Sequence, residues 1–129
     1  MSYADINRVV LVGRLARDPE LRALPSGTTV CGLRIVCNTI RNYGGVREVR
    51  PHYFDVFAFG VLGRNVERYL CEGSRVALAG RLDWREWETA DKQKHQLVSV
   101  VANSVQFLDP PVPQHGEDED DDTLDEADE

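Results

Sequence analysis

Residues 52–87 read HYFDVFAF-G-VLGRNVERYLCE-GS-RVALAGRLDWREW, two strand-like segments with a helix-like segment between them. The first segment, His52–Phe59, is rich in aromatic and β-branched residues, and the last, Arg75–Trp87, alternates between two kinds of side chain, as strands do. In the middle segment, Val61–Glu72, apolar residues recur at helical spacing, and Gly73 stands where a C-terminal cap belongs. The stretch therefore predicts a strand, a helix and a second strand.

Three further strand-like segments surround this stretch. Asn7–Leu15 and Thr28–Asn38 precede it, with a turn signal at Asp18-Pro19 between them, and Gln96–Leu108 follows it. The glycines of residues 42–45 mark a flexible hairpin tip before the third strand. Five strands with one helix between the third and the fourth are the layout of the oligonucleotide/oligosaccharide-binding (OB) fold. We therefore predict an all-β domain with one helix, folded as a five-stranded OB barrel.

The chain divides into two parts of opposite charge. Residues 1–108 hold 11 acidic residues and all 15 Lys and Arg residues, a net charge of +4, whereas residues 109–129 hold 11 acidic residues and no Lys or Arg. Prolines open the second part, and its carboxylates repel one another with almost no apolar burial to oppose them. We predict an OB domain at residues 1–108 and a disordered acidic tail at residues 109–129. A basic body of this kind points to nucleic acid as its partner.

Several other classes of protein are disfavoured by what the chain lacks. It has no secretory signal and no apolar run of membrane-spanning length, so we expect a cytoplasmic protein without a membrane partner. The cysteines Cys31, Cys37 and Cys71 form no CxxC pair and are expected to serve as small apolar residues in strands and a helix. The acidic run at residues 117–122 lacks the spacing of a calcium loop, and no catalytic motif is found. We expect no metal, no cofactor and no enzyme activity.

Side chains that can bind nucleic acid alternate along the predicted fourth strand. Arg81, Arg85 and Trp87 fall on one parity of that strand, which places them on one face. Guanidinium groups pair with phosphates, and an indole ring stacks on a base of any identity. The pattern therefore predicts a surface for unpaired nucleotides, with an ordinary solvated strand as the alternative.

The predicted third strand adds aromatic residues of one parity, Tyr53, Phe57 and Phe59. One parity of the strand must face the interior of the barrel, so some of its aromatic residues belong to the core. We expect at least one of Tyr53 and Phe59 to be exposed for base stacking, and Phe57 to be the packing residue of the three.

Other cations extend the predicted surface, and 13 of the 15 basic residues are arginine. Arginine both pairs with phosphates and stacks on bases, which lysine does less well. Arg8, Arg34 and Arg41 belong to the first strands and the loop after the second, and Lys92 and Lys94 lie in a loop that would flank a bound strand. For each arginine taken singly, ordinary surface solubility is an equally good explanation.

Short motifs run through the body of the chain: Asn7–Leu15 (NRVVLVGRL), Asp18–Arg22 (DPELR), Pro25–Gly27 (PSG), Phe57–Gly60 (FAFG), Val66–Leu70 (VERYL), Gly73–Val76 (GSRV), Gly80–Leu82 (GRL) and Trp84–Trp87 (WREW). Together they resemble the bacterial single-stranded DNA-binding proteins over roughly residues 5–108. The resemblance implies an OB fold, a homotetramer without a cofactor, and single-stranded DNA wrapped around the assembly. It implies stacking roles for Tyr53, Phe59 and Trp87, and it matches basic positions of the family to Arg8 and Arg85.

We therefore expect sequence-independent binding and protection of single-stranded DNA during replication, recombination and repair, in the cytoplasm and associated with the nucleoid. The alternative is a protein-interaction adaptor of the replication and restart machinery, since a fold alone does not determine a function. An adaptor need not keep a stripe of aromatic residues and arginines, and this feature distinguishes the two hypotheses.

Two features depart from the pattern of the family. Some members have a stacking Trp after the second strand, where this chain has Arg41. Many members end in an acidic run followed by a short Pro-Phe tip that docks on replication and repair proteins, whereas this chain ends in residues 124–129, LDEADE. Replication and repair proteins are therefore candidate partners, but without the usual docking tip.

Overall fold

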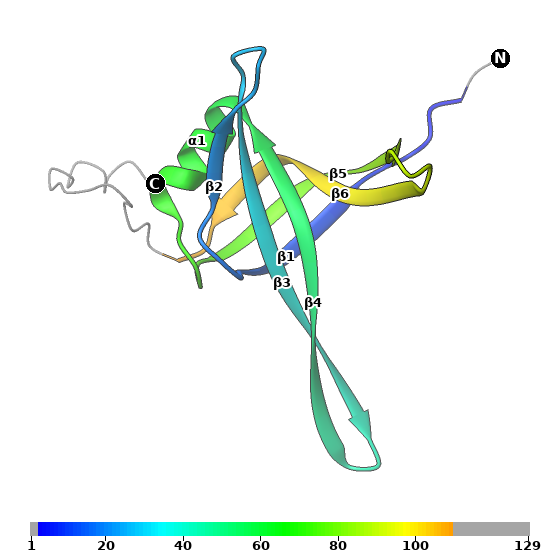
Figure 1. The fold of residues 1–129 in the computed structure, drawn as a ribbon. Helices are drawn as coiled ribbons and strands as arrows, with labels where there is room; N and C mark the ends of the chain where they lie inside the picture. The colour runs from blue at the N-terminus through cyan, green and yellow to red at the C-terminus, as the bar shows by residue number, and fades with distance from the viewer. Residues whose placement is uncertain (1–2, 110–129) are drawn as a thin grey trace, which may run out of the picture.

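The barrel closes because its first strand is paired along both edges. The computed structural model describes residues 3–109, which form six strands and one helix (Figure 1). In chain order the elements are β1 (Val9–Leu15), β2 (Glu20–Ala23), β3 (Thr29–Tyr43), β4 (Val46–Phe59), α1 (Gly60–Tyr69), β5 (Arg75–Glu88) and β6 (Lys94–Phe107).

The sheet has the order β1-β5-β6-β4-β3-β2, and an additional pairing of β1 with β3 joins the sheet into a ring. In that pairing Arg14 lies opposite Val36, and Leu15 lies opposite Ile35. The closed ring contains β1, β5, β6, β4 and β3, while β2 pairs only with β3. The prediction of a five-stranded OB barrel with one helix is confirmed.

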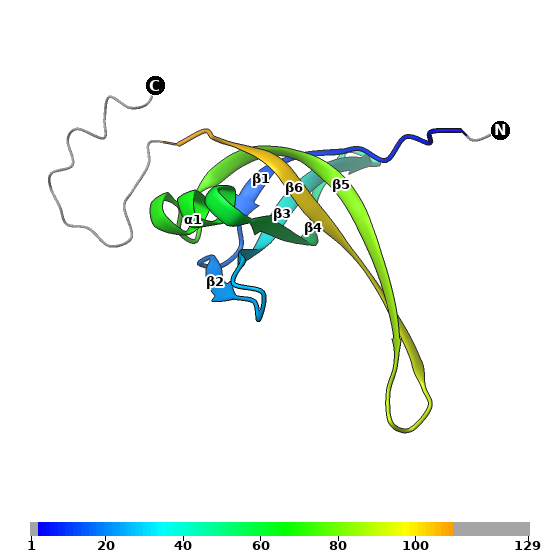
Figure 2. The ribbon, with the colours of Figure 1, turned by 90° about the horizontal axis from the view of Figure 1, so that it is seen from above.

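Alternate side chains of the strands fill the interior of the barrel. Leu33 and Ile35 of β3 are buried together with Val56 and Ala58 of β4, and the residues between them point outward. Helix α1 covers one end of the barrel (Figure 2), where Val66 joins the same core cluster. The core therefore settles which parity of each strand is left for the surface.

Helix α1 ends at Tyr69, three residues before the predicted end at Glu72. Leu70 already has extended backbone angles, with φ −115° and ψ 155°, and its side chain is buried in the core cluster. Leu70 thus leaves the helical conformation while its side chain stays in the core. Cys71 consequently lies after the helix, which corrects the expectation that the helix would contain it.

The short strand β2 is missing from the sequence-based prediction. All four of its residues are exposed, so it has no buried face and no apolar alternation that would mark a strand. It forms because it pairs with β3, with Glu20 opposite Gly32 and Ala23 opposite Thr29.

Two hairpin arms project from the barrel in different directions, and both are longer than predicted (Figures 1 and 2). Strands β3 and β4 stay paired as far as Tyr43 opposite Val46, and β5 and β6 as far as Glu88 opposite Lys94. The hairpin tip predicted at residues 42–45 is confirmed. The strands beside both tips are mostly exposed on both faces, so they lack the pattern of a half-buried strand.

The three cysteines form no disulfide. Cys31 is buried in the core, and this burial raises the pKa of its thiol to about 11, with a smaller contribution from the charges of Glu67 and Glu20. The thiol therefore stays protonated near neutral pH, and Cys31 acts as a small apolar core residue, as expected from the sequence.

Gly63 determines how closely α1 approaches the sheet, and it provides a test of the fold. A Cβ atom at this position would lie 2.4 Å from the carbonyl oxygen of Ala58 and 3.2 Å from the Cβ of Cys31. We expect Gly63→Ala to lower the free energy of unfolding by about 1–2 kcal/mol, because the steric cost exceeds the gain in helix propensity. Urea denaturation at a fixed protein concentration measures the change.

Val61→Ala is the matched control, since Val61 lies on the same helix with its side chain 63% exposed. Equal unfolding midpoints for the two variants would show that α1 does not pack this closely on β3 and β4.

Candidate nucleic-acid interface

The outer face of β3 and β4 presents aromatic side chains. Because Val56 and Ala58 point into the core, Tyr53, Phe57 and Phe59 point outward. Tyr53 is 52% exposed and Phe59 is 43% exposed. Both rings are therefore accessible, which confirms the expectation that at least one of them would be. Phe57 is the most covered of the three, but it is half-buried on the outer face and is not part of the core cluster.

Arg34 of β3 connects this aromatic row to a carboxylate. Its Nη1 atom lies 3.4 Å from Oδ1 of Asp55, directly opposite on β4, and its guanidinium carbon lies 5.2 Å from the ring centroid of Tyr53. Both partners of the ion pair are substantially exposed, so water screens it and its contribution to stability is small. The guanidinium is thus held beside the ring of Tyr53 by contacts that are easily exchanged.

The same outer face continues across β6 onto β5. Phe57 pairs with Val101 of β6, and Val101 pairs with Arg81 of β5, so the three side chains lie on one side of the sheet. Arg85 and Trp87 follow at alternate positions of β5 and keep to this side along the hairpin arm. Register alone therefore joins β4 and β5 into one surface, which we call the outer binding face: Arg34, Tyr53, Phe59, Arg81, Arg85 and Trp87.

Trp87 is partly covered by its neighbour across the hairpin. Its ring and the ring of His95 have centroids 5.6 Å apart and planes inclined by 22°, which is a stacked arrangement. Trp87 is still 45% exposed, so one part of the indole remains accessible to a further planar group.

Arg8 lies at the edge of this face, whereas Arg41 lies away from it. Arg8 stands just before β1, and Val9 pairs with Gly80, which brings Arg8 beside Arg81 in the register of β1 and β5. Arg41 lies far along the β3–β4 arm, where its guanidinium covers the ring of Tyr43 at 5.1 Å and bonds to the hydroxyl of the same residue.

The two lysines lie at the end of the other arm. Lys92 is in the turn between β5 and β6, with a φ of 65°, and Lys94 begins β6 opposite Glu88. Both side chains are exposed. The structure thus brings six of the ten predicted residues onto one face and distributes Arg8, Arg41 and the two lysines around it.

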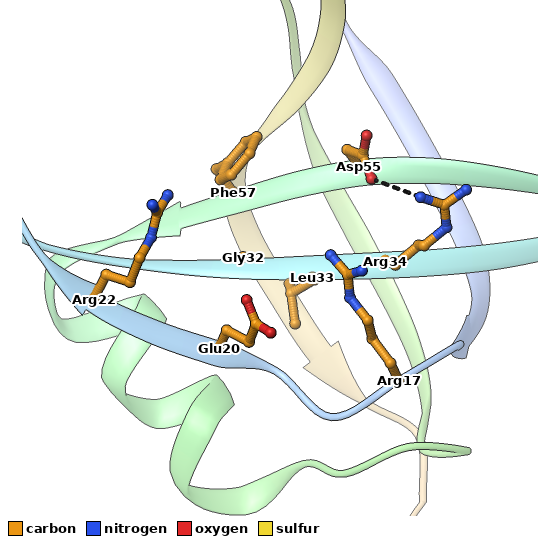
Figure 3. A pocket seen from close by; sticks show the side chains of 8 residues that line it. All are labelled: Arg17, Glu20, Arg22, Gly32, Leu33, Arg34, Asp55 and Phe57. Carbon is orange, nitrogen blue, oxygen red and sulfur yellow. Dashed lines mark hydrogen bonds and ion pairs between the residues drawn. The ribbon is translucent and has the colours of Figure 1, made fainter.

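A hollow on the outer side of β2, β3 and β4 was missed by the sequence reasoning (Figure 3). Its volume is about 340 Å³, and Gly32 forms part of its lining. The alternation of Glu20, Leu21 and Arg22 is a signal that could have pointed to it, because it puts the two charged residues on the same side. The residues that line the hollow are Arg17, Glu20, Arg22, Gly32, Leu33, Arg34, Asp55 and Phe57.

Neither a metal centre nor a membrane span is found in the part of the chain that the structure describes. Within residues 3–109 no three His, Cys, Asp or Glu side chains gather as metal ligands. The helix in this range is too short to cross a membrane.

Solved structures of similar fold were found by comparison of the backbone. A Plasmodium falciparum SSB in complex with single-stranded DNA superposes with a TM-score of 0.74 at 22% sequence identity, covering 84% of this chain and 100% of that one. A deletion mutant of the single-stranded DNA-binding protein from Thermus aquaticus superposes with a TM-score of 0.69 at 26% identity, covering 86% and 52%.

Sequence comparison gives a more specific result. Single-stranded DNA-binding protein 2 of Staphylococcus aureus (strain Mu50) is 43% identical over 106 residues, which are 81% of this chain and 74% of that protein. Single-stranded DNA-binding protein 1 of the strain MSSA476 is 41% identical over the same length, covering 81% and 67%. The model of the single-strand binding protein family matches residues 6–108. The chain belongs to the single-strand binding protein family.

Proposed function

We propose that this protein binds single-stranded DNA without regard to its sequence and protects it during replication, recombination and repair. The observation that carries the proposal is the outer binding face, where exposed rings and guanidinium groups occupy outward positions of β4 and β5. The names of the relatives, which are those of single-stranded DNA-binding proteins, support it.

The chemistry of the face explains a lack of sequence preference. Every base has a flat face, so a ring such as that of Trp87 stacks on any of the four. Arginines beside the rings pair with phosphates, which are the same at every nucleotide. A duplex offers its phosphates but keeps its bases stacked and paired, so the rings gain nothing from it. We therefore expect strong preference for unpaired strands.

The adaptor hypothesis is disfavoured by the same face. A barrel that only docks proteins does not need rings and arginines at alternate positions of two strands. The relatives carry the names of DNA-binding proteins. We infer from this a binding role without catalysis. We also infer a location in the cytoplasm, at the nucleoid.

We further propose that the chain assembles as a homotetramer, which the resemblance to the family implies. Support comes from β1, whose outward residues Val10 and Val12 are 72% and 47% exposed. They pair with Ala79 and Ala77 of β5, so their neighbours on that strand are apolar. An exposed apolar strand of this kind is typical of a protein interface, and a second copy of the chain is the proposed occupant.

The role of Trp87 is tested by Trp87→Ala. We expect the affinity for oligo-dT to fall by about 1–3 kcal/mol, the value of one lost base stack. Fluorescence anisotropy of a labelled oligo-dT measures the affinity. Trp84→Ala is the control, because Trp84 is 56% exposed on the opposite side of the same strand. Equal losses in both variants would contradict a specific role for the outer binding face.

The assembly is tested by Val10→Asp, which places a charge on the apolar side of β1. We expect the mass measured by light scattering to fall from that of a tetramer to that of a smaller species, because an unpaired charge is costly to bury. Val61→Asp on α1, where Val61 is 63% exposed, is the control that should leave the mass unchanged. A monomeric wild-type protein would contradict the tetramer.

The acidic segment at residues 110–129 lies outside the described residues, and we propose that it competes with DNA for the basic body. It holds ten carboxylates and no Lys or Arg, so Coulomb attraction favours its contact with the arginines. Deleting residues 110–129 should tighten oligo-dT binding at low salt and matter little at high salt, where charges are screened. Equal affinities of both forms at low salt would refute the competition.

A further inference from the structure

We propose that the hollow between β2, β3 and β4 is an additional nucleotide subsite, in which one base stacks on Phe57 while Arg17 and Arg22 pair with the neighbouring phosphates (Figure 3). The inference rests on the proposed binding of single-stranded DNA and extends it to residues on which the outer binding face does not depend.

The hollow exists because one side chain is absent. Gly32 pairs with Phe57 of β4 on one side and with Glu20 of β2 on the other, so it occupies the centre of a row of three strands. A Cβ atom at Gly32 would lie 3.7 Å from Cε1 of Phe57, and any larger side chain would fill the space in front of the ring. The resulting volume of about 340 Å³ is at the lower end of pockets that hold small ligands, about 300–1,000 Å³.

The charges of the hollow divide into a paired and an unpaired set. Arg34 and Asp55 form an ion pair with each other. Arg17 and Arg22 form no ion pair with any residue of the described range 3–109. Their guanidinium groups are therefore available to phosphates, for which arginine has suitable fork geometry.

The ring of Phe57 makes a nucleotide a better occupant than an acidic peptide. The carboxylate of Glu20, which stands between the two arginines in Figure 3, repels the anionic groups of either ligand. A nucleotide gains a contact that an acidic peptide lacks, because its base stacks on the ring of Phe57. The combination of an aromatic ring with two arginines that form no ion pair thus favours a base and its phosphates.

The position of Phe57 fits the path of a bound strand. Tyr53, Phe57 and Phe59 lie on one side of β4, and neighbouring outward positions are about 6.6 Å apart along a strand. A DNA strand that touches Tyr53 and Phe59 therefore passes over Phe57. The hollow lies directly beside this path, toward β2.

The base contact is tested by Phe57→Leu, which keeps an apolar side chain and removes the ring. We expect oligo-dT binding, measured by fluorescence anisotropy, to weaken at least about fivefold, the lower end for the loss of one stacked base. Phe107→Leu is the control, because Phe107 of β6 packs near Tyr69, with ring centroids 6.4 Å apart, and is absent from the lining of the hollow.

The phosphate contacts are tested by the double variant Arg17→Ala/Arg22→Ala. It should reduce the slope of log affinity against log salt by about 1.4, since each phosphate contact to a single strand contributes about 0.7. Phe57→Leu should leave this slope unchanged. Arg68→Ala on α1 removes the same kind of charge away from the hollow and is the control for a general effect of charge.

The outcomes separate this inference from the proposed function. If Phe57→Leu binds oligo-dT as tightly as the wild type while Trp87→Ala binds it more weakly, the subsite is overturned and the proposed function stands. If the wild-type protein does not bind oligo-dT, the proposed function itself is overturned. Tighter DNA binding by the arginine double variant assigns the hollow to the acidic segment of the chain and overturns the subsite.

A variant that unfolds would not decide the question, so the wild-type chain provides a second measurement. An oligo-dT in which thymidines are replaced by 5-iododeoxyuridine should cross-link on irradiation to the peptide that contains Phe57. Cross-links confined to peptides without Phe57, Arg17 or Arg22 would overturn the subsite.

Discussion

The pairing of β1 with β3 is the contact on which the other features of this protein depend. It turns a sheet with two free edges into a ring, so that each barrel strand has one face enclosed and one face in solvent. Gly13 permits the approach, because a Cβ atom there would lie 2.3 Å from the carbonyl oxygen of Val36. Once the ring is closed, alternation along a strand becomes a strict division between core and surface. The aromatic residues of β4 are outside because the aliphatic ones are inside.

This division gives the outer surface an unusual composition. Rings and guanidinium groups that elsewhere would be buried or paired stand exposed along β4 and β5, and few of the described arginines are engaged by carboxylates. Such a surface is complementary to flat, negatively charged ligands. The parallel pairing of β4 with β6 is the link that makes it continuous, because it places Phe57, Val101 and Arg81 in one row.

The charge of the whole chain conceals the charge of the domain. A net charge of −7 suggests a protein that nucleic acids repel, but the acidic residues after position 108 outweigh a body that is itself +4. In the proposed competition, the body attracts both the phosphates of DNA and the carboxylates of the acidic segment, which resemble them in charge. Affinity for DNA is then a difference between two electrostatic contacts, and it depends on salt in both.

Much of the fold could be predicted from the sequence alone. The five barrel strands, the helix after β4 and the exposure of at least one of Tyr53 and Phe59 follow from local periodicity, since burial on one face leaves a period in the chain. The outer parity of Arg81, Arg85 and Trp87 was accessible for the same reason. The hairpin tip at residues 42–45 follows from its glycines, which are turn signals.

Other features were decided only by tertiary structure. Strand β2 and the outer half of the β3–β4 arm form by pairing with a neighbour and bury no face, so they leave no period to detect. The helix α1 ends at Tyr69 although its apolar spacing continues to Leu70. The hollow joins Arg17, Gly32 and Phe57, which are far apart in the chain, because three strands meet there in one register. Local pattern thus determined which residues face outward, while strand pairing decided which of them are neighbours, because only pairing relates distant segments in space.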